Sequence, residues 1–331
     1  MQKGNNEYSP FLSRVKTGMK AGIKKGVSCF FWLLKILVPI SFATTLLLYF
    51  GIIYKLDFLF APVMDLLTLP AVAVVPLLVG LFTGIYGAVA AMAVLPLTMN
   101  QMALIAIFLL ISHGLVLESI VQGKSGINPF FAAFFRIITS VIVTFICAKI
   151  MGENLVQQAV AVVQTIAPSE QTFMQMLQVW GLDISKLGLK IICIIIPLMV
   201  VLEVAKEFNT IYYITKAISP VLFILGLNKK TGVLWLTAAT FGLAFGSAVI
   251  VEETKTNSFS KLEITPLQLS IGINHAMIED PALFLTLGIP PFWLWIPRLI
   301  AAIAATYLFH TLNFLRRLNA KRAGHKKFCN N

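Results

Sequence analysis

Two histidines lie inside apolar segments of membrane length, and carboxylates follow each of them. His113 belongs to the run SHGLVLES, which ends with Glu118 and a serine; His275 belongs to NHAMIEDP, which contains Glu279 and Asp280. Ionisable groups are costly inside a bilayer and usually face a polar cavity or a partner. Histidine also exchanges protons near neutral pH. We therefore favour a polar site or pathway over the alternative, in which His–Glu hydrogen bonds only lock helices together.

The second of these segments carries the denser set of polar groups. His275 and Glu279 are four residues apart and share one face of a helix, with Asn274 and Asp280 beside them. Pro281 disfavours helical geometry at Asp280. We expect the helix to bend or unwind there, which frees backbone carbonyls for ligands.

Two arginines, Arg136 and Arg298, each follow a Pro-Phe pair inside an apolar run. Each lies about 10 Å along its helix at a rise of 1.5 Å per residue. Three roles remain open for them: extension to the membrane interface, neutralisation of Glu118 and Glu279, or contact with an anionic substrate. A zinc enzyme is disfavoured because no HExxH motif is present, and no metal ligands are assigned.

The composition identifies the class of protein that must position these groups. The 331 residues are 58% hydrophobic and 12% charged, with a mean hydropathy of +0.87. A soluble domain cannot bury so much apolar surface. Runs such as 71–99 reach the ~20 residues that cross a bilayer and lack the period-two alternation of barrel strands. We predict an all-α, polytopic membrane protein without a cofactor.

The net charge of +12 is concentrated at the two ends of the chain. Six Lys or Arg residues lie in 1–28 and six more in 316–331. Basic flanks stay in the cytoplasm, so both termini are predicted to be cytoplasmic, in a bacterial inner membrane. The pattern favours contact with the lipid bilayer over nucleic-acid binding. Residues 1–28 predict a basic amphipathic helix on the cytoplasmic leaflet, with the first span following from about Phe30.

An internal repeat relates the two halves of the chain. At an offset of 158 residues Pro39 matches Pro197 and Gly84 matches Gly242; at an offset of 162 the shared pairs are His113 with His275, Pro129-Phe130 with Pro291-Phe292, and Arg136 with Arg298. We predict a first repeat over 29–151 and a second over 186–315. The segment 152–185 is predicted to be an extracytoplasmic linker, and 316–331 a basic cytoplasmic tail.

The number of crossings decides how the repeats are oriented. The linker carries acidic residues and no Lys or Arg between Lys149 and Lys186, so we expect it to be external. Each half then crosses an odd number of times and the repeat is inverted. This requires the weak stretches at 57–70 and 208–227 to cross or re-enter. The prediction is about eight to ten transmembrane or re-entrant helices, and eight crossings with a parallel repeat is the alternative.

Three motifs resemble a known family. SHGLVLESIVQGKSG in the first half, and FGLAFGSAVIVEET followed by NHAMIEDPALF in the second, are similar to the nucleoside recognition, or Gate, domain membrane proteins. The resemblance covers about residues 30–315 as two Gate-like halves. It implies a helical membrane protein that handles a small solute. The family name implies nucleosides, although members handle different solutes.

These observations predict a transporter or permease of a small polar solute, and not an enzyme. The expected solute is nucleoside-like or another small anion or cation, with coupling to a proton or cation and assembly as a homodimer as further expectations. The predicted solute site consists of His113, Glu118, Asn274, His275, Glu279, Asp280, Arg136 and Arg298. The alternatives are a non-transporting membrane scaffold or partner subunit and, second, transport of a metal cation.

Overall fold

The computed structural model describes residues 10–52, 57–152, 172–208, 218–256 and 259–328. All regular elements among them are helices, which confirms the all-α prediction. Four long helices are α1 (Pro10–Tyr49), α8 (Pro129–Met151), α10 (Phe173–Glu207) and α16 (Pro291–Phe328). The other elements are α3 (Asp57–Leu66), η1 (Ala71–Ala73), α4 (Val74–Thr83), α5 (Ile85–Met92), α6 (Met99–Ser112), α7 (Leu115–Lys124), α12 (Ser219–Ile224), η2 (Lys229–Thr231), α13 (Gly232–Thr256, interrupted at Gly242), α14 (Lys261–Asn274) and α15 (Glu279–Leu285).

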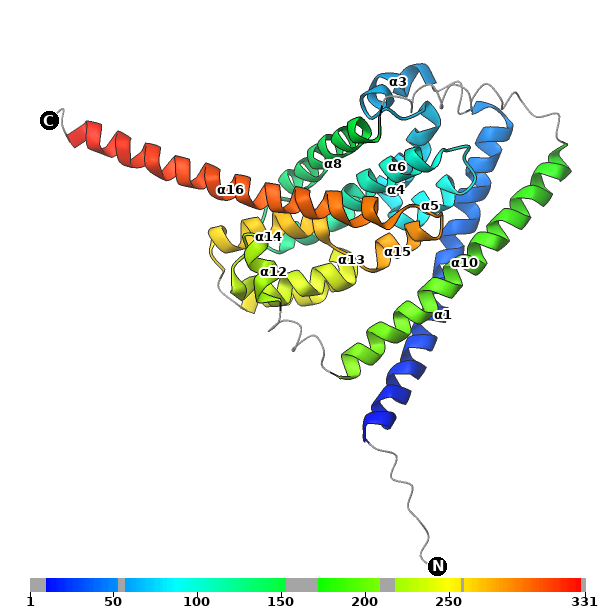
Figure 1. The fold of residues 1–331 in the computed structure, drawn as a ribbon, viewed down its shortest axis with the longest axis horizontal. Coiled ribbons are helices and arrows are strands. Elements are labelled where there is room, and N and C mark those ends of the chain that lie inside the picture. Colours follow the sequence, from blue (N-terminus) through cyan, green and yellow to red (C-terminus); the bar gives the residue numbers. More distant parts are fainter. Residues whose placement is uncertain (1–9, 53–56, 153–171, 209–217, 257–258, 329–331) are drawn as a thin grey trace, which may run out of the picture.

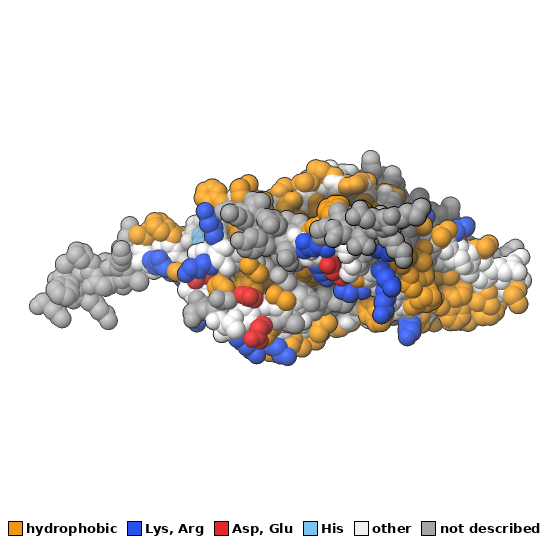
Figure 2. Space-filling view, turned by 90° about the horizontal axis from the view of Figure 1, so that it is seen from below, with side chains coloured by type: hydrophobic (Ala, Val, Ile, Leu, Met, Phe, Trp, Pro, Cys, Tyr) orange, Lys and Arg blue, Asp and Glu red, His pale blue; other side chains and the backbone are white. Residues whose placement is uncertain are grey.

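Within the described residues, five segments are long and apolar enough to cross a membrane. They are Phe11–Tyr49, Met99–Lys124, Pro129–Met151, Phe173–Glu207 and Pro291–Asn319. The second of these is not one helix but α6 and α7, which meet near its middle. Figure 2 shows hydrophobic side chains over much of one face, with Lys and Arg side chains gathered between them.

The two halves contain the same elements in the same order. The first half runs α1, α3, η1, α4–α5, α6, α7 and α8, and the second runs α10, α12, η2, α13, α14, α15 and α16. Gly84 separates α4 from α5 at φ 93°, and its counterpart Gly242 breaks α13 at φ 74°. Glycine is needed at both positions because positive φ is strained for other residues.

The helices α1 and α10 pack along each other as an antiparallel pair (Figure 1). Gly18 faces Val204 and Gly26 faces Ile196, so residue numbers rise along one helix as they fall along the other. The glycines let the two backbones approach closely. At Gly22, halfway between them, an added Cβ would lie 2.4 Å from the Cα atom of Val200.

The structure differs from the sequence prediction at the amino-terminal ends of both helices, α1 and α10. The expected surface helix in 1–28 and the expected first span are one continuous helix, α1, from Pro10. Glycine weakens an isolated helix, but α1 continues through Gly26, where it packs closely against Ile196 of α10. Likewise, the described end of the predicted linker, from Phe173, is the start of α10. Residues 1–9 and 153–171 lie outside the described part of the chain.

The two weak stretches contain only short helices where they are described. At 1.5 Å per residue, the 10 residues of α3 and the 6 residues of α12 are about 15 and 9 Å long, short of a ~30 Å hydrocarbon core. Pro62 lies inside α3, whereas Pro220 is in the first turn of α12. The two prolines therefore occupy different positions in their helices, and only Pro220 lies where a helix begins. Residues 53–56 and 209–217, which adjoin these helices, are outside the described ranges.

Candidate functional site

Each of the two histidines lies where a membrane helix stops. The helix α6 ends at Ser112 and α14 ends at Asn274, and His113 and His275 follow in extended geometry at ψ 161° and 166°. The residue after each histidine has a positive φ: Gly114 (53°) in one half and Ala276 (45°) in the other. The predicted unwinding therefore occurs at the histidine and not before Pro281, which lies inside α15.

Backbone hydrogen bonds hold the two breaks in the same way. The N–H of Gly114 donates to the Gly80 carbonyl at 3.0 Å, and the N–H of Ala276 donates to the Ala238 carbonyl at 2.9 Å. Both acceptors lie one turn before the glycine breaks at 84 and 242, and the Gly80 carbonyl also accepts from the N–H of Gly84 at 3.0 Å. Each hydrogen bond joins the two interruptions of one half and gives the buried N–H after the histidine a partner, as the interior of a membrane requires.

The two imidazole rings face one another in the protein interior. Their Nε2 atoms are 3.4 Å apart and their ring centroids 4.9 Å apart. Nδ1 of His113 lies 2.8 Å from the Leu109 carbonyl oxygen, and Nδ1 of His275 lies 3.0 Å from that of Ile271. A carbonyl can only accept, so both hydrogen bonds place a proton on Nδ1. In the neutral rings, the bare Nε2 lone pairs then point into the shared space.

Two carboxylates complete this cluster, one from each half. Glu118 lies 3.4 Å from His113 Nε2 and 3.1 Å from His275 Nε2, and Asp280 lies 3.2 Å from His113 Nε2. Asp280 follows Glu118 by 162 residues, the separation of the two histidines. The counterpart of Glu118 is thus Asp280. The sequence instead suggested Glu118 and Glu279 as the carboxylates that the two arginines could neutralise. We call His113, His275, Glu118 and Asp280 the central cluster.

The arginines are buried beside the cluster, at 0% and 1% exposure, and do not extend to the membrane interface. Arg136 donates to the carbonyls of Ile111 and His113, and Arg298 donates to those of Ile273 and His275. Each guanidinium thus covers the carbonyls that the broken helix leaves without partners. Arg136 also pairs with Glu118 at 2.6 Å. Among the described residues, no ion pair joins Arg298 to Glu279.

Two other predicted site residues occupy different positions. Asn274 is fully buried, and neither its amide nitrogen nor its oxygen has a hydrogen-bond partner among the described residues. Its counterpart Ser112 instead donates to the Phe108 carbonyl at 2.8 Å. Glu279 accepts a hydrogen bond from Tyr86, and among the described residues it forms no ion pair with either histidine. An unpartnered buried amide is costly, which makes Asn274 a candidate contact for a bound solute.

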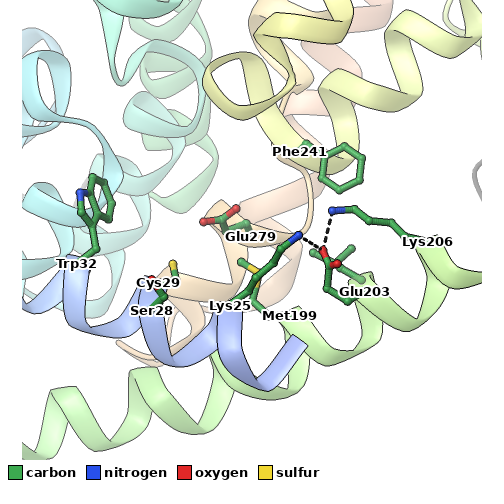
Figure 3. A pocket seen from close by; sticks show the side chains of 10 residues that line it. Lys25, Ser28, Cys29, Trp32, Met199, Glu203, Lys206, Phe241 and Glu279 are labelled. Atoms are coloured by element: carbon green, nitrogen blue, oxygen red, sulfur yellow. Dashed lines mark hydrogen bonds and ion pairs between the residues drawn. The ribbon is translucent and has the colours of Figure 1, made fainter. Parts of the chain in front are cut away.

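Glu279 also contributes to the lining of a cavity of about 610 Å³ (Figure 3). It is lined by Lys25, Ser28, Cys29, Trp32, Met199, Leu202, Glu203, Lys206, Phe241 and Glu279. Glu203 pairs with Lys25 at 2.8 Å and with Lys206 at 2.7 Å, so one carboxylate bridges α1 and α10. Glu279 adjoins Asp280 in the chain, and this places the cavity next to the central cluster.

Sequence reasoning missed two groups of polar residues. Tyr86 is a single phenol in the apolar helix α5, with no pattern to mark it. Gln122 donates to the Gln268 carbonyl at 2.7 Å, and Gln268 donates to the Ser125 carbonyl at 3.1 Å, which ties α7 to α14. Gln268 lies between two leucines and Gln122 follows Ile120 and Val121, a signal that could have marked both amides as contacts between the halves.

Comparison with known proteins supports the membrane assignment. The chain is 28% identical over 292 residues to "Uncharacterized membrane protein YvoD" of Bacillus subtilis (strain 168), covering 86% of this chain and 92% of that protein. No family model matches the chain, and no solved structure matches it. Together with the long apolar helices, the similarity identifies an all-helical, multi-pass membrane protein.

Proposed function

We propose that this protein is a transporter or permease that binds a small polar solute at the central cluster. The observation that carries the proposal is the meeting of four ionisable side chains at helix breaks from both halves, deep in the protein. His113 lies near the middle of the candidate span Met99–Lys124. Discontinuous helices around a site near the membrane midplane are typical of secondary transporters.

The antiparallel packing of α1 and α10 supports an inverted repeat. These helices are counterparts in the two halves, since Pro39 in α1 matches Pro197 in α10. Two counterpart helices that cross the membrane in opposite directions are expected when the halves are upside down relative to each other. Inversion supplies two similar states, each open to a different side of the membrane.

The cavity beside Glu279 is the proposed entrance from one side. Lys25 contributes to its lining, and it belongs to the basic segment predicted to be cytoplasmic. The ion pair between Glu203 of α10 and Lys25 of α1 joins these two helices beside the cavity, so its opening would widen the path. The side chains of the cluster are almost fully buried, which fits a closed state between outward and inward opening.

The resemblance to Gate-domain proteins makes nucleosides the first solutes to test. In this proposal Asn274, Glu279, Arg136 and Arg298 act around the cluster, with the arginines holding the broken helices in place. The protein has no catalytic role under this proposal. Coupling to a proton or cation would act through the histidines, which change charge near neutral pH.

Uptake by purified protein in liposomes tests the proposal. A thermal-shift screen of nucleosides, small anions and small cations selects solutes that stabilise the wild type and not His275→Ala. Wild-type liposomes should then accumulate such a solute above protein-free liposomes, and Glu118→Gln should abolish uptake. A scaffold would behave otherwise: the same substitutions would lower thermal stability, and no tested solute would enter with the wild type.

A further inference from the structure

We infer that the central cluster is a binding site for a divalent transition-metal ion, with His113 Nε2, His275 Nε2 and the Asp280 carboxylate as ligands. The inference deepens the proposed function, because it names the class of cargo that the same site accepts. Candidate ligand atoms of these three residues all lie within 4.8 Å of one another, and all three residues are buried. They come from both halves, so an ion bound here would join the two repeats.

The separations between the ligand atoms suit a single small ion. In a tetrahedral site with metal–nitrogen and metal–oxygen bonds of about 2.0–2.2 Å, neighbouring ligand atoms are about 3.3–3.6 Å apart. The two Nε2 atoms are 3.4 Å apart, and His113 Nε2 lies 3.2 Å from Asp280 Oδ2. These two pairs are within a few tenths of an ångström of the tetrahedral separation, whereas the third pair, His275 Nε2 and the Asp280 carboxylate, lies within 4.8 Å and has to move closer when one ion binds all three residues.

The hydrogen bonds of the cluster turn acceptor atoms toward its centre, where a positive charge is favourable. Both Nδ1–H groups are committed to backbone carbonyls, so each neutral ring turns a lone pair toward the other. Asp280 Oδ2 is buried beside them without a hydrogen-bond donor. Lone pairs and a carboxylate repel one another at this distance unless a positive charge, either a proton on one Nε2 or a metal ion, lies between them. Metal-binding histidines usually donate their other ring N–H to a carboxylate, a backbone carbonyl or water, and both histidines here donate Nδ1–H to a backbone carbonyl.

The ligand types favour a transition metal over Mg²⁺ or Ca²⁺. Imidazole suits Zn, Fe, Cu and Ni, whereas Mg²⁺ and Ca²⁺ take oxygen ligands. Three protein ligands leave the fourth position of a tetrahedral site open, as expected for a site that exchanges its ligand or its ion. Glu118 borders both imidazoles and is held by Arg136, so it adds negative charge next to the ion. Asn274 precedes His275 in the chain, and its side-chain amide is buried without a hydrogen-bond partner among the described residues.

Equilibrium metal binding by tag-free, metal-depleted protein in nanodiscs tests the inference. Zn²⁺ and Co²⁺ are the probes, with Mg²⁺ as a competitor. We expect one ion per chain, an intense visible Co²⁺ spectrum typical of tetrahedral coordination, and no displacement by excess Mg²⁺. His275→Gln and Asp280→Asn should each weaken binding by more than about 100-fold, since even outer partners of a metal site cost up to that much.

Two controls separate loss of the site from loss of the fold. His310→Gln removes an exposed histidine that bonds the Gly226 carbonyl far along α16, and it should bind Zn²⁺ like the wild type. Asp280→Asn removes a carboxylate oxygen that has no donor, so its unfolding temperature without metal should be no lower than that of the wild type. Absence of Zn²⁺ and Co²⁺ binding by the wild type, or wild-type affinity in Asp280→Asn, would overturn the inference.

Transport data distinguish this inference from the proposed function. If nanodisc protein binds Zn²⁺ through these residues while liposomes take up no solute, the metal site stands and the transport proposal fails. If liposomes take up a nucleoside in metal-free buffer and the protein binds no Zn²⁺ or Co²⁺, the transport proposal stands and the metal inference fails.

Discussion

Replacement of Arg298 by methionine removes the groups that cover the broken end of α14. The guanidinium donates three hydrogen bonds, two to the Ile273 carbonyl at 3.0 Å and one to the His275 carbonyl at 2.6 Å. Two buried carbonyls without donors cost about 1–3 kcal/mol each, and removal of a buried cation recovers part of that loss. We expect Arg298→Met to lower the free energy of unfolding by about 2–4 kcal/mol.

The counterpart substitution, Arg136→Met, should cost more. Arg136 covers the carbonyls of Ile111 and His113 in the same way, and it also pairs with Glu118 at 2.6 Å. Loss of one partner from a buried ion pair costs about 3–5 kcal/mol, because the other charge stays buried. The two arginines thus form a matched pair in which only one neutralises a carboxylate. We expect Arg136→Met to be about 2 kcal/mol more destabilising than Arg298→Met.

Unfolding of the purified protein in mixed micelles, by titration with a denaturing detergent, measures both free energies. A double-mutant cycle isolates the charge: Glu118→Gln should rescue part of the loss in Arg136→Met, with a coupling energy of about 0.5–3 kcal/mol. The same Glu118→Gln change should not rescue Arg298→Met. Equal losses for both arginines, or no coupling between Arg136 and Glu118, would refute this description of the two helix breaks.

Three further predictions concern other parts of the molecule. Gly22→Ala places a Cβ 2.4 Å from the Val200 backbone and should cost about 1–3 kcal/mol, whereas Gly181→Ala, with open space around it, should not destabilise; unfolding titrations compare them. In a protein that keeps Cys29 as its one reactive thiol, a membrane-impermeant maleimide should label Cys29, which lines the cavity, from the cytoplasmic side, and labelling only from the outside would contradict the proposed orientation. Hydrogen bonds from the backbone N–H and hydroxyl of Ser260 hold the pKa of Glu263 below its ordinary value of 4.5. The stability that this carboxylate adds is therefore present above pH 4.5 and lost as the pH falls below it, so the difference between wild type and Glu263→Gln should disappear in acid; a difference that persists there would contradict this.

The general class of the fold and the centre of the site could be predicted from the sequence. Apolar composition and run length predict membrane helices, because the bilayer imposes length and hydrophobicity directly. Histidine and arginine are rare in such helices, so their recurrence at one offset marked His113, His275, Arg136 and Arg298 before any contact was known. The structure brings all four into one buried region.

The details that depend on packing could not be predicted in the same way. The four-residue spacing predicted that His275 and Glu279 share one helix face. The chain unwinds at His275, and the carboxylate of this segment that contacts a histidine is Asp280, which lies 3.2 Å from His113 Nε2. The basic stretch before Phe30 suggested a separate surface helix, yet contact between Gly22 and α10 keeps α1 continuous. Such outcomes depend on close approach between distant segments, for which local sequence carries no signal.

Solute uptake through the central cluster is the claim that matters most, and proteoliposomes test it most directly. Uptake of nucleosides and of Zn²⁺ or Co²⁺ should be measured for the wild type, for the double variant His113→Gln/His275→Gln, and for His310→Gln as the histidine control. The proposal predicts that at least one solute enters with the wild type and with His310→Gln, and that its entry falls to the protein-free level in the double variant. Full uptake by the double variant would contradict it.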